Sequence, residues 1–552
     1  MLHYLTLLGI LVCGTALRLI QLERKPLWVD EIFTALFSLG TGFDRVPLEQ
    51  LIPLSDVPNL LALNPTATCP DIARTLAEQS THPPLFFCLM HRWLVELDGL
   101  PISLTFQLRA FAVLFGVGAI ALIYLLNRLA FSPQAGLIGS AIVAFSPFGV
   151  YQSQEARHYT LPVFLIALSL ILLLQMGRDI EKERLRQWIW GSWAMVNAIG
   201  FYTHYFCLIA FVAQILTLIA LLYKTQSRFL LPATFFSLLP LILFSPWFPT
   251  LVEHFTSPKT SWLPPPQHIT PLLQTLLAMA LMVVIPPVEN QPLWIIIPLS
   301  ACSLLFLFWA IQQILPRFKT LIRNPKTHQA TFILSSFIAW TLLQFLVIVY
   351  LLQKDITSAP RYSFLYYPAF CALLGASFSQ RKWNLRGKLS PRLPISPSPR
   401  LSILSPRLLI LLGISLASSL CVVFNLAFQK PYHPLTVARQ LNTAPASLVM
   451  VMGYNDTLPI SLGLSYALAL EQIRTQKEDD FLIFLNNEKG YDRVWENISQ
   501  DVRNPQNLWI FAPGLLKEQY PQKIDLNSGT QCLFDPAQYY RIGIPYQGYS
   551  CR

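Results

Sequence analysis

Charged side chains are scarce in this sequence. Asp, Glu, Lys and Arg supply only 12% of its 552 residues, whereas 53% are hydrophobic, and the mean hydropathy is +0.47. Apolar runs long enough to cross a bilayer recur from one end of the chain to the other. This composition excludes an ordinary water-soluble protein and is typical of a polytopic α-helical membrane protein.

Several common functional motifs are also missing. The chain has no P-loop, no G-x-G-x-x-G and no heptad array, which argues against ATP-driven chemistry. Its nine cysteines show no C-x-x-C spacing, so no zinc cluster is indicated. The formal net charge of +11 sits mostly in short loops, where it reports topology and anionic lipid rather than nucleic acid.

The apolar runs predict the membrane spans. No small-residue cleavage site follows the first run, Leu2 to Ile20, so we interpret it as an uncleaved first helix. Leu85 to Leu97 is short for a hydrocarbon core of about 30 Å and carries charges, so we expect an amphipathic helix on the outer face. The candidate spans lie near 2–20, 105–127, 135–152, 160–176, 188–204, 205–223, 229–252, 271–288, 292–315, 330–352, 362–379 and 406–428.

Basic loops orient these spans, because such loops stay in the cytoplasm. They place residues 21–104 in a long first outer loop with surface-lying helices. The charges agree with the spans only if one apolar run fails to cross, and the proline-flanked run 271–288 is the best candidate. We therefore predict about eleven transmembrane helices, with the N-terminus inside and the C-terminus outside. The basic groups are Arg178/Lys182/Arg184/Arg186, Lys224/Arg228, Arg317/Lys319/Arg323/Lys326 and the run within 381–407.

Composition also separates two other regions. Residues 381–407 hold a Ser-Pro-Arg-Leu repeat, which we interpret as a cytoplasmic low-complexity insertion without a catalytic role. After the transmembrane domain, residues 1–429, we predict a small extracytoplasmic α/β domain with a partly parallel sheet over 430–552. Cys532 and Cys551 either pair there or stay free. The expected strands are 448–452, 481–485 and 508–511, and the expected helices lie around 458–476 and 491–503.

Five polar clusters fall on the predicted outer face. Taken alone, each has an ordinary explanation as solvated loop charge, a proline-led helix start or an interfacial anchor. Their gathering on one face favours a shared functional site. The clusters are Asp30-Glu31, Thr81-His82-Pro83-Pro84, Ser153-Gln154-Glu155-Ala156-Arg157-His158-Tyr159, Tyr202-Thr203-His204-Tyr205 and Pro360-Arg361-Tyr362.

The side chains in these clusters suit phosphate chemistry. Arg157 and Arg361 offer planar donors for phosphate oxygens, and a nearby carboxylate can take a proton from an acceptor hydroxyl as a phosphate leaves. Histidines can tune that proton transfer, contact phosphate or, with Glu155 or Asp30, hold a divalent metal, which the scattered spacing suggests only weakly. The histidines are His82, His158 and His204.

The motifs follow one another in an order that one known superfamily shares. The matching pieces are Trp28-x-Asp30-Glu31, His82-Pro83-Pro84-Leu85, Ser146-Pro147 with Ser153-Gln154-Glu155-Ala156-Arg157-x-Tyr159, Tyr202-Thr203-His204 and Arg361-Tyr362. Over roughly residues 1–380 the chain resembles the GT-C superfamily of polytopic glycosyltransferases. The similar branch is the one related to protein O-mannosyltransferases, which includes bacterial lipid A and lipopolysaccharide-core glycosyltransferases.

The resemblance implies transfer of a hexose or pentose from a polyprenyl-phosphate-linked donor to a lipid, glycan or protein acceptor, normally with inversion. Asp30 would be the general base, with Glu31 in support and Glu155 as a second acid. The site would face the outside of the inner membrane. Acceptor identity does not carry over, because the C-terminal part departs from the lipid A enzymes. Donor phosphate and substrate would be bound by Arg157, Tyr159, Arg361, Tyr362, His82 and His204.

Two alternatives stay open. A transporter or flippase for lipid-linked sugars would favour inverted repeats and charges at mid-membrane depth, whereas this sequence shows no internal repeat and places its polar clusters at one face. A polysaccharide polymerase or ligase would share an outer-face site and lipid-phosphate donors. The acid pair directly after the first span favours a transferase over the polymerase or ligase.

Overall fold

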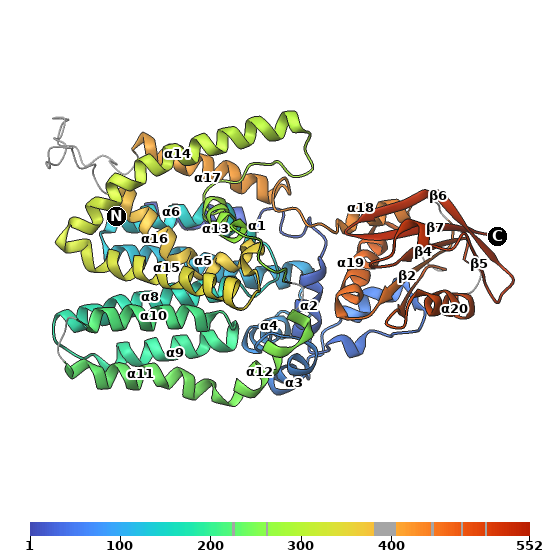
Figure 1. Ribbon diagram of the computed structural model, residues 1–552, viewed down its shortest axis with the longest axis horizontal. Helices are drawn as coiled ribbons and strands as arrows, with labels where there is room; N and C mark the ends of the chain where they lie inside the picture. The colour runs from blue at the N-terminus through green and yellow to red at the C-terminus, as the bar shows by residue number, and fades with distance from the viewer. Residues whose placement is uncertain (224–226, 261–262, 380–404, 443–445, 476–478, 503–504) are drawn as a thin grey trace. The chain divides into compact units, whose positions relative to one another are not determined.

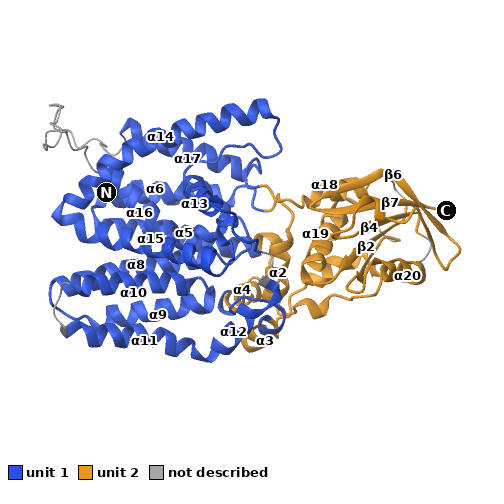
Figure 2. Ribbon diagram, viewed as in Figure 1, with its two compact units in different colours: residues 1–22, 76–86, 108–428 blue, residues 23–75, 87–107, 429–552 orange. Residues whose placement is uncertain are grey.

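The chain folds into two compact units, which Figure 2 shows in blue and orange. The computed structural model describes residues 1–223, 227–260, 263–379, 405–442, 446–475, 479–502 and 505–552. Unit 1 comprises residues 1–22, 76–86 and 108–428, and unit 2 comprises residues 23–75, 87–107 and 429–552. Most of the predicted first outer loop thus groups with the C-terminal residues. The domain boundary expected at residue 429 stays a prediction, and the insertion at 381–407 lies outside the described residues up to residue 404.

Unit 1 is helical. Its helices follow the apolar runs of the sequence, and Figure 1 shows α8 to α11 lying side by side. The helices are α1 (Leu2–Leu19), α5 (Leu104–Ala130), α6 (Pro133–Ala144), α7 (Pro147–Ser153), α8 (Thr160–Glu181), α9 (Gln187–Thr203), α10 (Cys207–Leu222), α11 (Leu230–Phe244), α12 (Phe248–Thr256), α13 (Thr270–Leu281), α14 (Leu293–Arg323), α15 (Pro325–Leu351), α16 (Tyr367–Ser379) and α17 (Pro406–Val423).

Seven helices among the described residues are long and apolar enough to cross a membrane, or eight if the bent pair α6 and α7 is one span. The chain is therefore a multi-span helical membrane protein. The predicted count of eleven is not confirmed, because α9, α10 and α16 form at expected positions with only 17, 16 and 13 residues. The seven are α1, α5, α8, Leu230–Thr256, α14, α15 and α17.

The run 271–288 forms a short helix followed by extended chain. The 12 residues of α13 span about 18 Å, too little for a hydrocarbon core of about 30 Å. The chain from Met282 to Ile285 then runs buried. Three serine hydroxyls from two other segments satisfy its backbone, as buried non-helical chain requires. The Ser146 hydroxyl donates to the Met282 carbonyl at 2.7 Å, and the Ser415 hydroxyl donates to the Val283 carbonyl at 2.8 Å. The Ser418 hydroxyl accepts the Ile285 N–H at 3.1 Å.

A buried arginine holds the first helix against the bend between α6 and α7. The two helices meet at 59°, where Ser146 caps α7 and Pro147 occupies its first turn. The break leaves the last carbonyls of α6 without helical partners. The guanidinium of Arg18, only 1% exposed, donates to the Val143 and Ala144 carbonyls at 3.0 and 3.1 Å and to the Ser153 hydroxyl at 3.1 Å.

Two glycines make room for this guanidinium. A Cβ at Gly116 would lie 2.2 Å from Ser153 Oγ, and one at Gly149 would lie 2.5 Å from the Tyr367 hydroxyl and 3.2 Å from an Arg18 nitrogen. The capping is mutual, because the side-chain amide of Gln154 donates to the Ile20 carbonyl at 3.0 Å just beyond the end of α1. The segment after α7 therefore starts from a fixed point.

Unit 2 is built on a seven-stranded sheet in the order β1-β3-β2-β4-β7-β6-β5. β2 is parallel to β3 and β4, and the other pairings are antiparallel. The predicted strands, helices and partly parallel sheet are confirmed, whereas the hairpin of β6 and β7 was not expected. The elements are α2 (Val29–Ser38), β1 (Ile52–Pro53), α18 (Pro434–Leu441), β2 (Leu448–Tyr454), α19 (Thr457–Ile473), β3 (Phe481–Asn486), α20 (Tyr491–Asp501), β4 (Asn507–Phe511), β5 (Lys523–Asp525), β6 (Gln531–Ile542) and β7 (Ile544–Cys551).

Two helices run from one unit into the other along the chain, α3 (Cys69–Gln79) and α4 (Leu85–Glu96). The helix expected over Leu85 to Leu97 is thus present. Unit 2 contains two disulfides, Cys532–Cys551 between β6 and β7 and Cys69–Cys88 between α3 and α4. The first was one of two options that the sequence left open, and the second was not anticipated.

Replacing Arg18 tests its structural role. Arg18→Gln removes the fork that satisfies two helix-end carbonyls and a hydroxyl, so we expect a loss on the order of 2 kcal/mol or more in unfolding free energy. Arg18→Lys keeps the charge without the fork and should be intermediate. Thermal unfolding in detergent measures this, with the exposed Arg24→Gln as the matched control. Equal melting temperatures for Arg18→Gln and Arg24→Gln would contradict it.

Candidate active site

The segment between α7 and α8 carries the buried polar residues of the Gln-Glu-Ala-Arg-x-Tyr motif. Gln154 anchors its start, and α8 begins directly after Tyr159. Within the segment Glu155, Arg157, His158 and Tyr159 are 8%, 5%, 1% and 3% exposed. Ionisable groups are this deeply buried only at a cost, so the segment is a candidate functional site rather than a surface loop.

Three histidines from distant parts of the sequence line up at this segment. The ring of His158 lies 4.9 Å from that of His82 and 4.7 Å from that of His204, centroid to centroid. We call these three residues the histidine row. Ser80 hydrogen-bonds His82 Nδ1 at 2.8 Å. The Phe206 backbone N–H donates to His204 Nδ1 at 3.0 Å, so a neutral His204 carries its hydrogen on Nε2.

Two arginines flank the histidine row, each over a tyrosine. The guanidinium carbon of Arg157 lies 5.8 Å from the centre of the Tyr159 ring, and that of Arg361 lies 5.8 Å from the centre of the Tyr362 ring. The two tyrosine rings are 6.5 Å apart. The side-chain amide of Gln152 donates to the Arg361 carbonyl at 3.1 Å, which ties this arginine's segment to α7.

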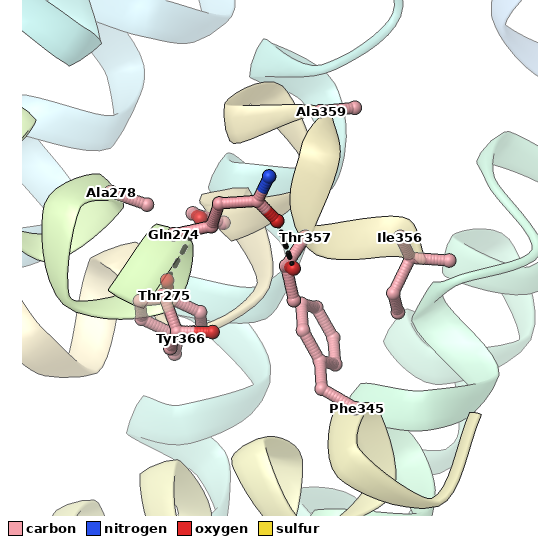
Figure 3. A pocket seen from close by; sticks show the side chains of 9 residues that line it. Gln274, Thr275, Ala278, Phe345, Ile356, Thr357, Ala359 and Tyr366 are labelled. Carbon is pink, nitrogen blue, oxygen red and sulfur yellow. Dashed lines mark hydrogen bonds between the residues drawn. The ribbon is translucent and has the colours of Figure 1, made fainter. Parts of the chain in front are cut away.

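The segment before Arg361 is held by α13 and α15. The Thr357 hydroxyl donates to the side-chain oxygen of Gln274 at 2.7 Å, as Figure 3 shows, and Asp355 accepts the Thr357 N–H at 3.0 Å. A cavity with an empty volume of about 190 Å³ lies beside it, lined in part by Phe345 and Tyr366. Its gaps are narrow, and we assign it no ligand.

Burial and positive charge keep the histidine row neutral. Desolvation is the main cause that lowers the pKa of each ring, and the charges of nearby cations lower it further. The pKa of His204 falls to about 3 by burial and by the charge of Arg157. At neutral pH this part of unit 1 therefore combines two guanidinium cations with three uncharged imidazoles, an arrangement suited to an anion.

Asp30 and Glu31 lie in the first turn of α2 in unit 2, where the helix dipole favours negative charge. The Glu31 carboxylate, fully buried, accepts the backbone N–H of Trp28 at 3.3 Å and so caps the helix. Asp30 is only half-buried. The two acids are therefore not equivalent, since the second is engaged in holding the helix start.

The chain that follows α17 packs against this turn within unit 2. The ammonium of Lys430 lies 3.9 Å from the centre of the Trp28 ring. Burial raises the pKa of Tyr432, and the charge of the Asp30 carboxylate raises it further. Both residues escaped the sequence reasoning, because no motif links positions about 400 residues apart.

The structure thus brings together seven of the residues singled out from the sequence, all in unit 1, with Glu155 in the same segment. Asp30 and Glu31 belong to unit 2. Arg18 and Gln152 were missed, although an arginine inside an apolar run is itself a signal of function or structure. Among the described residues no group of three or more His, Cys, Asp or Glu is arranged to hold a metal. The seven are His82, Arg157, His158, Tyr159, His204, Arg361 and Tyr362.

Residues 81–249 match the sequence profile of the family described as dolichyl-phosphate-mannose-protein mannosyltransferase. This segment contains all three members of the histidine row. The resemblance to GT-C superfamily glycosyltransferases stated from the sequence is confirmed.

The fold is similar to that of ArnT from Cupriavidus metallidurans. The structure of ArnT bound to undecaprenyl phosphate aligns with a TM-score of 0.52 at 12% identity, and the apo structure with 0.53 at 12% identity. Each alignment covers 98% of this chain and 97% of ArnT. The oligosaccharyltransferase AglB from Archaeoglobus fulgidus aligns with a TM-score of 0.49 at 10% identity over 92% of this chain and 69% of AglB. No curated protein sequence matches the chain.

The capping role of Glu31 makes a prediction about stability. Glu31→Ala removes the acceptor of the Trp28 N–H and should cost about 0.5–2 kcal/mol. Glu31→Gln keeps an acceptor at the same position and should unfold close to the wild-type temperature. Thermal unfolding of the two variants in detergent checks this. If both lose the same stability, the carboxylate charge matters and the cap does not.

Proposed function

We propose that the protein transfers a sugar, a hexose or a pentose, from a polyprenyl-phosphate-linked donor to a lipid, glycan or protein acceptor. The observation that carries this proposal is the pair of buried arginines, Arg157 and Arg361, beside the histidine row. Planar guanidinium donors in a desolvated site suit phosphate oxygens. The family match over residues 81–249 and the undecaprenyl phosphate bound by ArnT support a lipid-linked phosphate as the anion.

The proposed reaction is an inverting displacement. An acceptor hydroxyl attacks the anomeric carbon from the face opposite the phosphate and loses its proton to the general base, Asp30. We assign this role to the half-buried carboxylate of Asp30, whereas Glu31 caps α2 and supports Asp30. Arg157 and Arg361, with Tyr159, Tyr362, His82 and His204, hold the donor. Glu155 is the second acid, which orients Arg157 or the acceptor.

We propose the site and unit 2 to be extracytoplasmic, on the outer face of the inner membrane. The two disulfides of unit 2 favour this side, because disulfides persist in oxidising compartments. The proposed topology has about eleven spans, with the N-terminus inside and 271–288 as a segment that enters the membrane without crossing it. The shortness of α13 and the serine-satisfied chain after it support that interpretation.

Site-directed labelling tests the topology. With the exposed free cysteines Cys13 and Cys302 replaced by serine, we introduce Asn290→Cys or Lys326→Cys at exposed positions. A membrane-impermeant maleimide should label position 290 in intact cells and position 326 only after permeabilisation, because basic loops stay inside. Labelling of position 290 only after permeabilisation would refute the arrangement.

Sugar transfer tests the function directly. Labelled sugar supplied as polyprenyl-phosphate donors should enter an acceptor fraction of membranes that contain the wild-type protein. Asp30→Asn should lower the rate by about a hundredfold or more, because the base is lost, and Arg361→Ala should weaken use of the donor. Matched controls at exposed sites are Asp56→Asn and Arg323→Ala. Full activity of Asp30→Asn would remove the base assignment, and activity with nucleotide sugars alone would remove the lipid donor.

A further inference from the structure

The histidine row has a property that phosphate binding alone does not require. Its three imidazoles come from three separate segments, before α4, before α8 and after α9, and contact one another in sequence. Two arginines would suffice to bind a phosphate. Three adjacent titratable rings beside the arginines can in addition bind one proton and share it among themselves.

The groups whose charge acts on the row from outside it are two arginines and a fourth histidine. Arg157 adjoins it in the same segment, Arg361 comes from the segment before α16, and His254 of α12 acts on His82. The rings of Tyr159 and Tyr362 lie 5.9 and 6.5 Å from that of His204, centroid to centroid. Glu155 lies two residues before Arg157. In this setting desolvation lowers the pKa of every ring, so the row is uncharged at neutral pH.

A bound phosphate opposes this effect, because it raises the pKa of the histidine row to an extent that depends on the charge of the phosphate. A lipid-linked sugar phosphate is a diester with one negative charge, whereas the lipid phosphate left after transfer is a monoester with about −1.5 to −2 charges. An anion within a few ångströms stabilises the protonated imidazole, and the doubly charged one does so more strongly. The phosphate group beside the row therefore gains about one negative charge in each turnover.

We propose that the histidine row takes up one proton from solvent as the phosphodiester donor becomes the phosphomonoester product, and so neutralises the leaving phosphate. This proposal rests on the proposed function. In the transfer, the bond from the anomeric carbon to the phosphate oxygen breaks and its electron pair stays on phosphate. The acceptor oxygen forms the new bond and gives its proton to Asp30, and the proton on the row comes from water.

The row shares this proton as one unit, because its members interact with each other. His158 is the central member, since it alone contacts both others. Protonation makes the row a third cation beside Arg157 and Arg361 only when the phosphate carries its second charge. Stabilisation that appears with the developing charge lowers the barrier, whereas a permanent third cation would bind donor and product alike.

Calorimetry on the wild-type protein in detergent tests the proposal. A short-chain polyprenyl phosphate is titrated at pH 7.5 in buffers of different ionisation enthalpy, which yields the number of protons taken up per phosphate. We expect between about half and one proton, with affinity rising by up to about tenfold per unit of falling pH. The methyl diester of the same lipid carries one charge and should take up almost none. This comparison needs no variant.

Substitutions then assign the proton. The triple variant His82→Asn, His158→Asn, His204→Asn should bind the monoester more weakly, through its arginines, and with proton uptake abolished. The exposed His268→Asn should behave as wild type. Binding of the monoester without proton uptake would overturn this inference and leave the proposed function standing, as would equal uptake with the diester or unchanged uptake in the triple variant. If neither lipid binds the wild-type protein, the lipid-phosphate function itself fails.

Discussion

The guanidinium of Arg18 bridges α1 and the bend between α6 and α7, and the position of the candidate site depends on it. It satisfies carbonyls that the broken helix leaves bare and reaches the Ser153 hydroxyl, while Gln154 returns a hydrogen bond to the end of α1. Glycines at 116 and 149 leave the space. A charge this deeply buried is tolerated only when it is fully hydrogen-bonded. The bend therefore depends on Arg18 for partners to its carbonyls, and Arg18 depends on the bend for acceptors. The segment from Glu155 to Tyr159 follows directly after this contact.

The charge of the site depends on the burial of its residues more than on their proximity in the sequence. Arg157 and Arg361 keep their charge, because a guanidinium is protonated throughout the physiological range, whereas the imidazoles beside them lose theirs through desolvation. The result is a region with two lasting positive charges and with rings able to respond to a negative one. That asymmetry distinguishes an anion site with adjustable charge from a cluster of anchors at a membrane surface, which was the ordinary explanation of the same residues taken singly.

Local patterns predicted the elements whose signal is local. Long apolar runs located the helices, and short apolar runs located β2, β3 and β4. The hairpin of β6 and β7 escaped, because Asp535-Pro536-Ala537-Gln538 interrupts the alternation of β6 at a register shift. β1 has two residues and pairs with a strand more than 400 positions later. The run 135–152 was expected as one span and is two helices, since Ser146-Pro147 starts a new one.

The sequence by itself determined the membrane class, the positions of most helices, the partly parallel sheet and the set of polar motifs, because hydropathy and period report burial locally. Only the tertiary structure decided which of those motifs meet. It placed His158 between His82 and His204, tied Arg361 to Gln152 and left Asp30 half-buried. Such contacts join segments tens to hundreds of residues apart, and their formation depends on packing that no local pattern encodes.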